Sequence, residues 1–73
     1  LVEDDFRVAD PLITDLKRAG YVVDHSGDGI DAEFMGDEVD YDAVVLDLGL
    51  PGRPGLEVLA NWRGRGMKAP VLV

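Results

Sequence analysis

The sequence contains no cysteine, which excludes disulfide bonds, zinc sites built on thiolates and cysteine nucleophiles. It also lacks any run of about 20 apolar residues, the length that a membrane-spanning helix needs. No basic segment followed by an apolar one opens the chain, so nothing indicates export, and we expect a cytoplasmic protein without a membrane partner. The chain opens with Leu1 rather than Met, and we therefore expect that residues upstream are missing.

Positive charge is scarce. Seven Lys and Arg residues stand against 15 Asp and Glu residues, which gives a formal net charge of -8. Such a surface repels the phosphate backbone of nucleic acids, so we do not expect this segment to bind DNA directly. Hydrophobic residues make up 47% of the 73 residues, a composition typical of a packed globular domain or of part of one.

Short apolar runs rich in β-branched residues recur along the chain and predict strands. They occupy residues 21–23, 43–46 and 70–73, and Leu1-Val2 is typical of the end of a fourth strand. The run at residues 43–46 is apolar at every position, as in a parallel strand that helices cover on both faces. The runs favour an α/β fold.

Helical patterns fill the intervals between these runs. The first ends at Gly20 and begins either near Asp5, which places Pro11 inside the helix, or at Asp10 with Pro11 as the first helical residue. Two further helices are predicted at about residues 30–38 and 55–65. Alternating strands and helices imply right-handed crossovers, so we expect one doubly wound parallel sheet with about four strands and three helices.

Acidic residues follow two of the predicted strands. Glu3 and Asp4 come after the first strand, and Asp47 ends the most apolar one. In a sheet of flavodoxin-like order these strands are neighbours, so the three carboxylates converge where such folds bind ligands. Like charges this close need a cation, and Mg²⁺ suits carboxylate and carbonyl oxygens. Asp47 is then placed to attack phosphorus and form an acyl phosphate.

Three segments carry a family signature in their order and spacing: Leu1-Val2-Glu3-Asp4-Asp5, Asp28-Gly29, and Asp47-Leu48-Gly49-Leu50-Pro51 followed by Gly55. With them the chain resembles the receiver domain of bacterial two-component response regulators, most of all the OmpR-like subfamily, whose receivers precede a winged-helix DNA-binding domain. The resemblance covers nearly the whole chain. It implies a flavodoxin-like receiver fold and a protein that takes part in phosphorelay signalling rather than an enzyme.

The resemblance also implies roles for individual residues. Asp47 would accept a phosphoryl group from a sensor histidine kinase. Mg²⁺ would be held by Asp4 directly, by Glu3 largely through water, by Asp47 and by the backbone carbonyl of Gly49. Pro54 departs from the family, which usually has a polar residue before the Gly.

The resemblance further implies that the chain, residues 1–73, is a partial receiver. The family's Ser or Thr after the fourth strand and its Lys after the fifth would lie beyond Val73. DNA contact would belong to a C-terminal domain absent from these residues. Phosphorylation would favour a homodimer of the intact protein on promoter DNA and so control transcription.

Other interpretations of the motifs remain open at this point. Gly27, Gly29 and Ala32 fit the G-x-G-x-x-A pattern of dinucleotide-binding folds, although Asp28 and Asp31 would repel a pyrophosphate. A hydrolase that forms an aspartyl phosphate commonly has a second Asp at the position of Gly49. A purely structural segment is the third alternative.

Several single residues are assigned no chemistry. We interpret Trp62 as a core residue and His25 as a surface or packed residue. Arg53, Arg63 and Arg65 are interpreted as a solvated basic rim.

Overall fold

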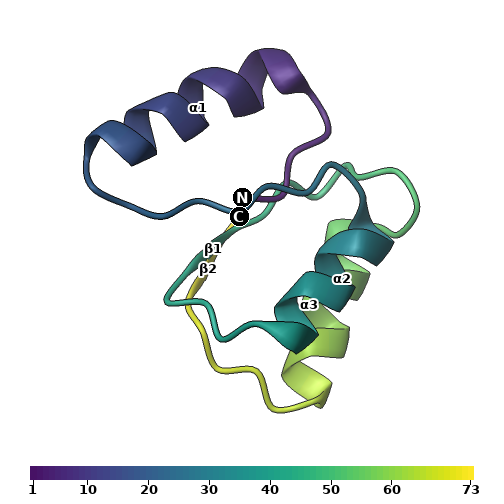
Figure 1. Cartoon of the computed structure of the whole chain (residues 1–73). Coiled ribbons are helices and arrows are strands. Elements are labelled where there is room, and N and C mark those ends of the chain that lie inside the picture. Colours follow the sequence, from purple (N-terminus) through teal and green to yellow (C-terminus); the bar gives the residue numbers. More distant parts are fainter.

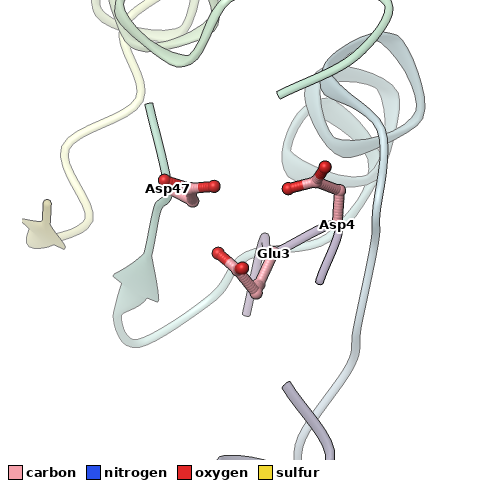
Figure 2. A group of neighbouring side chains, drawn as sticks. All are labelled: Glu3, Asp4 and Asp47. Atoms are coloured by element: carbon pink, nitrogen blue, oxygen red, sulfur yellow. The ribbon is translucent and has the colours of Figure 1, made fainter. Parts of the chain in front are cut away.

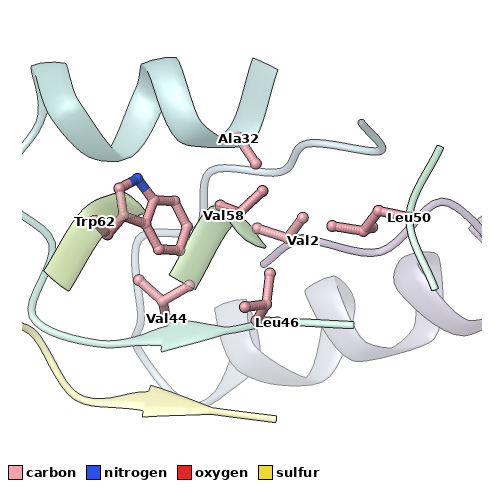
Figure 3. Packing of buried hydrophobic residues seen from close by; sticks show 7 residues of the cluster. All are labelled: Val2, Ala32, Val44, Leu46, Leu50, Val58 and Trp62. Carbon is pink, nitrogen blue, oxygen red and sulfur yellow. The ribbon is translucent and has the colours of Figure 1, made fainter. Parts of the chain in front are cut away.

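A computed structural model describes all of residues 1–73 as three helices and a parallel sheet (Figure 1). The chain follows α1 (Phe6–Arg18), α2 (Gly29–Glu38), β1 (Val44–Val45), α3 (Gly55–Gly64) and β2 (Val71–Leu72). The strands separate α1 from the pair formed by α2 and α3, so the helices lie in two layers on opposite sides of the sheet (Figures 1 and 3). This is the α/β arrangement that the sequence predicts. None of the three helices has the length and hydrophobicity of a membrane-spanning segment.

The pairing of the extended segments gives the order of the sheet. Strands β1 and β2 pair in parallel, with Val44 opposite Val71. Val2 forms parallel bridges to Ser26 on one side and to Leu46 on the other. The order across the sheet is therefore the Ser26 segment, the Val2 segment, β1 and β2. This is the flavodoxin-like order 2-1-3-4, and it makes the segment before Glu3 the direct neighbour of the segment before Asp47.

One predicted strand is wrong. Residues 21–23 form no strand, and Val22 is 99% exposed. The contact with the sheet comes later, where the Ser26 amide donates to the Leu1 carbonyl (3.0 Å) and the Glu3 amide donates to the Ser26 carbonyl (3.0 Å). β-branched residues favour a strand only where the sheet offers them a neighbour to pack against. Of the four predicted strands, those at residues 43–46 and 70–73 are formed, the Leu1-Val2 segment contributes bridges at Val2 alone, and residues 21–23 contribute none.

Helix α1 resolves the alternative starts that the sequence leaves open. It begins at Phe6 with Asp5 as its N-cap, whose side chain accepts from the Arg7 amide, so Pro11 lies inside the helix. Proline has no amide hydrogen, and α1 therefore lacks one interior hydrogen bond. Only Ala9 of this helix is buried, and no residue of α1 belongs to the main core cluster.

The main core lies on the other side of the sheet (Figure 3). Trp62 of α3 is 1% exposed, as the sequence predicts, and its indole nitrogen donates to the Glu33 carbonyl of α2 (3.1 Å). A Cβ atom on Gly36 would come within 2.5 Å of the indole, so α2 and α3 approach as closely as they do because residue 36 has no side chain. The cluster consists of Val2, Ala32, Val44, Leu46, Leu50, Val58 and Trp62.

Candidate functional site

Three carboxylates meet at the carboxyl ends of two neighbouring segments. Glu3 and Asp4 follow Val2, Asp47 follows Leu46, and the Asp47 amide donates to the Val2 carbonyl (2.9 Å), which fixes the two segments in register. One oxygen of each carboxylate lies within 4.8 Å of the others. Figure 2 shows the three side chains turned toward a common space. The structure thus brings together the three acidic residues that the sequence singles out.

No basic side chain of the molecule neutralises this group. The ion pairs involve other acids, namely Asp5, Glu33, Asp37 and Glu57. Burial and the neighbouring carboxyl group of Asp47 raise the pKa of Glu3, against the hydrogen bond from the Asp5 amide (3.3 Å). The raised pKa reports an environment that disfavours one more negative charge.

The donor set fits a hard divalent cation. Carboxylate oxygens are the ligands that Mg²⁺ takes in proteins, and a cation would offset the repulsion among these groups. Asp4 is exposed while Glu3 and Asp47 are half-buried, so the group is open to solvent on one side, and Mg²⁺ usually keeps several waters. Gly49, the fourth predicted ligand, is an exposed residue of the loop after Asp47, and its amide donates to Asp47 Oδ1 (3.4 Å).

The loop after Asp47 is held at both ends. Leu50 inserts into the core, and the Gly55 amide donates to the Leu48 carbonyl (3.0 Å), which closes the loop where α3 begins. The Pro51 carbonyl accepts from the Gly29 amide at the start of α2 (3.0 Å). The loop beside the carboxylates is therefore attached to a second helix.

A buried carboxylate on α2 escaped the sequence analysis. Glu33 is 8% exposed and accepts hydrogen bonds from Arg53 Nη1 (2.7 Å) and Asn61 Nδ2 (2.7 Å), while Arg65 Nη2 lies 3.1 Å from its Oε2 atom. Burial raises the pKa of Glu33, but the hydrogen bonds from Asn61, Arg65 and Arg53 outweigh it, so the pKa lies below its ordinary value.

The predicted solvated rim is incomplete as a description of Arg53 and Arg65: the Arg65 side chain is 46% exposed, but both guanidinium groups also pair with Glu33. One sequence signal points to Glu33. Gly29 and Gly36 stand four residues before it and three after it, on the same face of α2, and mark a face that other segments approach closely.

The residues of the possible dinucleotide-binding motif have structural roles in this fold. The Asp28 side chain accepts from the amides of Ile30 and Asp31, so it caps the helix end that a pyrophosphate would use. Ala32 is a core residue, and a Cβ atom on Gly29 would lie 1.9 Å from the Arg53 carbonyl oxygen. The motif here serves helix capping and packing.

Comparison with known proteins gives a consistent match over the whole chain. Residues 1–73 match the family model described as the response regulator receiver domain. The chain is 40% identical over 73 residues to the transcriptional regulatory protein QseB of Escherichia coli O157:H7, covering 100% of this chain and 33% of that protein. The response regulator protein PmrA of Pseudomonas aeruginosa is 40% identical with the same coverage. The transcriptional regulatory protein TcrA of Mycobacterium tuberculosis is 42% identical, with 29% of its length covered. The chain spans about a third of the length of these relatives.

Proposed function

Because this chain belongs to the family of response regulator receiver domains, we propose that Asp47 accepts a phosphoryl group from the phosphohistidine of a sensor kinase. The observation that carries the proposal is the convergence of Glu3, Asp4 and Asp47 within 4.8 Å without a basic partner. Receiver domains act in two-component signalling, and we infer that this one is a phosphoacceptor rather than an enzyme with a small-molecule substrate.

The residues of the site divide the work in this proposal. An oxygen of Asp47 forms the new bond to phosphorus while the bond from phosphorus to the histidine nitrogen breaks. Asp47 follows β1 and Leu46, and its backbone is held in place by the sheet through the hydrogen bond from its amide to the Val2 carbonyl (2.9 Å). Glu3, Asp4, Asp47 and the Gly49 carbonyl would hold Mg²⁺, which when bound supplies positive charge opposite the oxygens of the transferring group.

The output of the proposed phosphorylation lies outside these residues. Relatives named transcriptional regulators are about three times as long as this chain, so we infer that residues 1–73 form part of a receiver domain in a longer protein. The net charge of -8 opposes direct contact with DNA, which we assign to another domain. Phosphorylation would favour a homodimer on promoter DNA in the cytoplasm.

The test is phosphorylation of the full-length protein by a small phosphodonor, with and without Mg²⁺. We expect an acyl phosphate that requires Mg²⁺ and that the Asp47→Asn variant does not form. Asp42→Asn is the matched control, because Asp42 is an exposed acid before β1 and its substitution changes the charge by the same amount. Labelling that persists in Asp47→Asn would contradict the proposal.

A further inference from the structure

The loop between Asp47 and α3 is attached to α2 by two contacts. The Gly29 amide at the first turn of α2 donates to the Pro51 carbonyl (3.0 Å). One turn further along, the Glu33 carboxylate accepts from Arg53 Nη1 (2.7 Å). Both loop residues lie within six positions of Asp47. The place of the loop therefore depends on a helix that contributes no carboxylate to the acidic site.

The contact between Glu33 and Arg53 is partly buried and shares its carboxylate with other donors. The side chain of Glu33 is 11% exposed, and its two oxygens are shared among Arg53, Asn61 and Arg65. Hydrogen bonds between charged groups are the strong ones in proteins, and a partly buried pair loses much when one partner is removed. The Arg53 backbone also lies against Gly29, where a Cβ atom would clash with its carbonyl oxygen at 1.9 Å, so the loop has no room to move toward α2.

We propose that Glu33 and Arg53 are positioning residues for the acidic site, which hold the loop carrying Gly49 at the distance from Asp4 and Asp47 that cation binding requires. The inference rests on the proposed function and adds two residues to it. Neither residue touches the cation or the phosphoryl group. They act through the backbone of residues 48–54, and loss of either loosens that backbone.

A positioning role and a simple charge effect of Arg53 predict opposite changes in Mg²⁺ affinity. Arg53 is positively charged, so its removal makes the region more negative and by charge alone strengthens cation binding. Positioning predicts the opposite, since a loosened loop binds the cation less tightly. Arg65 provides the matched control: it pairs with the same Glu33 oxygen, 3.1 Å away, but belongs to the end of α3 and not to the loop.

The experiment measures the dissociation constant of Mg²⁺ by calorimetry in the full-length protein. We expect Arg53→Gln to weaken Mg²⁺ binding about tenfold, as substitutions behind metal ligands commonly do. Arg65→Gln should leave the affinity unchanged or slightly higher. Equal affinities in the two variants, with a wild type that binds Mg²⁺ and is phosphorylated, would overturn the positioning role and leave the proposed function intact.

A second variant covers the case in which Arg53→Gln does not fold. Glu33→Gln keeps the shape of the side chain and one accepting oxygen, and should weaken Mg²⁺ binding more than Asp37→Asn, which removes a negative charge from the same helix. Where both variants fold, the double variant Glu33→Gln/Arg53→Gln should bind Mg²⁺ no more weakly than Arg53→Gln alone. Each substitution breaks the same contact, the one between Glu33 and Arg53, so the second has nothing further to remove. Additive losses would contradict the proposal, and a wild type without Mg²⁺ affinity would overturn it together with the proposed function.

Discussion

Two carboxylates of this molecule, Glu33 and Glu3, meet opposite surroundings. Glu33 lies between α2 and α3 with two arginines and an asparagine around it, and its pKa lies below the ordinary value. Glu3 lies beside Asp4 and Asp47 with no Lys or Arg paired to its carboxylate, and its pKa is raised by burial and by Asp47. The first carboxylate is neutralised by its own chain. The second belongs to a group that no Lys or Arg of the chain neutralises.

The two groups of carboxylates differ in what they contribute to the folded protein. A buried carboxylate with its partners present stabilises the packing around it, whereas an unneutralised group costs stability and persists where it serves binding. Both groups lie beside the same loop, Glu33 through Arg53 and the acidic group through Asp47.

The largest effect is expected for Glu33→Ala. The substitution removes the acceptor that Arg53, Asn61 and Arg65 share, although Arg65 keeps Asp37. We expect a loss of about 2 to 3 kcal/mol in the free energy of unfolding, below the value for fully buried pairs because both arginines are partly exposed. Urea denaturation measures it. Glu57→Ala is the control: Glu57 is an exposed acid 3.8 Å from Arg53, and its removal should cost less than about 0.5 kcal/mol. Equal losses would remove the distinction between the two acids.

Addition of Mg²⁺ should act on the acidic group alone. At a concentration about ten times the dissociation constant, binding should stabilise the folded protein by about 1.4 kcal/mol, seen as a higher midpoint of thermal unfolding. Asp4→Asn should reduce this gain sharply because it removes one of the three carboxylates, whereas the exposed Asp42→Asn should keep it. A gain that survives Asp4→Asn would place the cation elsewhere.

Without Mg²⁺, Asp47→Asn should stabilise the protein. It removes one of three like charges a few ångströms apart in a partly solvated setting, a repulsion of about 1 kcal/mol at such distances in water. Urea denaturation in the presence of a chelator measures the change. The expected changes in the free energy of unfolding have opposite signs, a loss for Glu33→Ala and a gain for Asp47→Asn. A loss of stability in Asp47→Asn would contradict the contrast between the two acidic groups.

The smallest effect concerns pH. The pKa of Glu33 is lowered in the folded state, so the unfolded chain binds the proton more tightly, and the contribution of Glu33 is present above its ordinary value of 4.5. It is lost as the pH falls through the lowered pKa. The difference in stability between the wild type and Glu33→Gln should therefore shrink on acidification below 4.5. A difference that stays constant with pH would assign the effect of the substitution to packing.

The convergence of the three acids was predictable because it depends on local rules. Glu3, Asp4 and Asp47 follow apolar strand segments, and the carboxyl ends of neighbouring parallel strands meet at one edge of the sheet. The bounds of α2 and α3, predicted at about residues 30–38 and 55–65, agree with the structure to within one residue. The roles of the acids in phosphoryl transfer and metal binding stay predictions.

The Glu33 contacts were missed because they join residues far apart along the chain. Arg53 and Asn61 lie 20 and 28 positions after Glu33, and no local pattern reports such a pairing. The strand predicted at residues 21–23 failed for a related reason: its apolar residues have the right type, but the neighbouring segment pairs with Ser26 instead. The Glu33 contacts and the pairing of this strand both depend on tertiary partners, which the secondary-structure propensities of the residues do not specify.

Trp62 is the single tryptophan of the chain, and its place gives the molecule a selective fluorophore. The indole is enclosed by α2, α3 and β1, with its nitrogen on the Glu33 carbonyl, and α1 supplies no residue to the same cluster. Its emission therefore reports the side of the sheet that carries Glu33 and is insensitive to the state of α1. Circular dichroism counts all three helices, so a protein in which α1 detaches first loses ellipticity before its fluorescence changes.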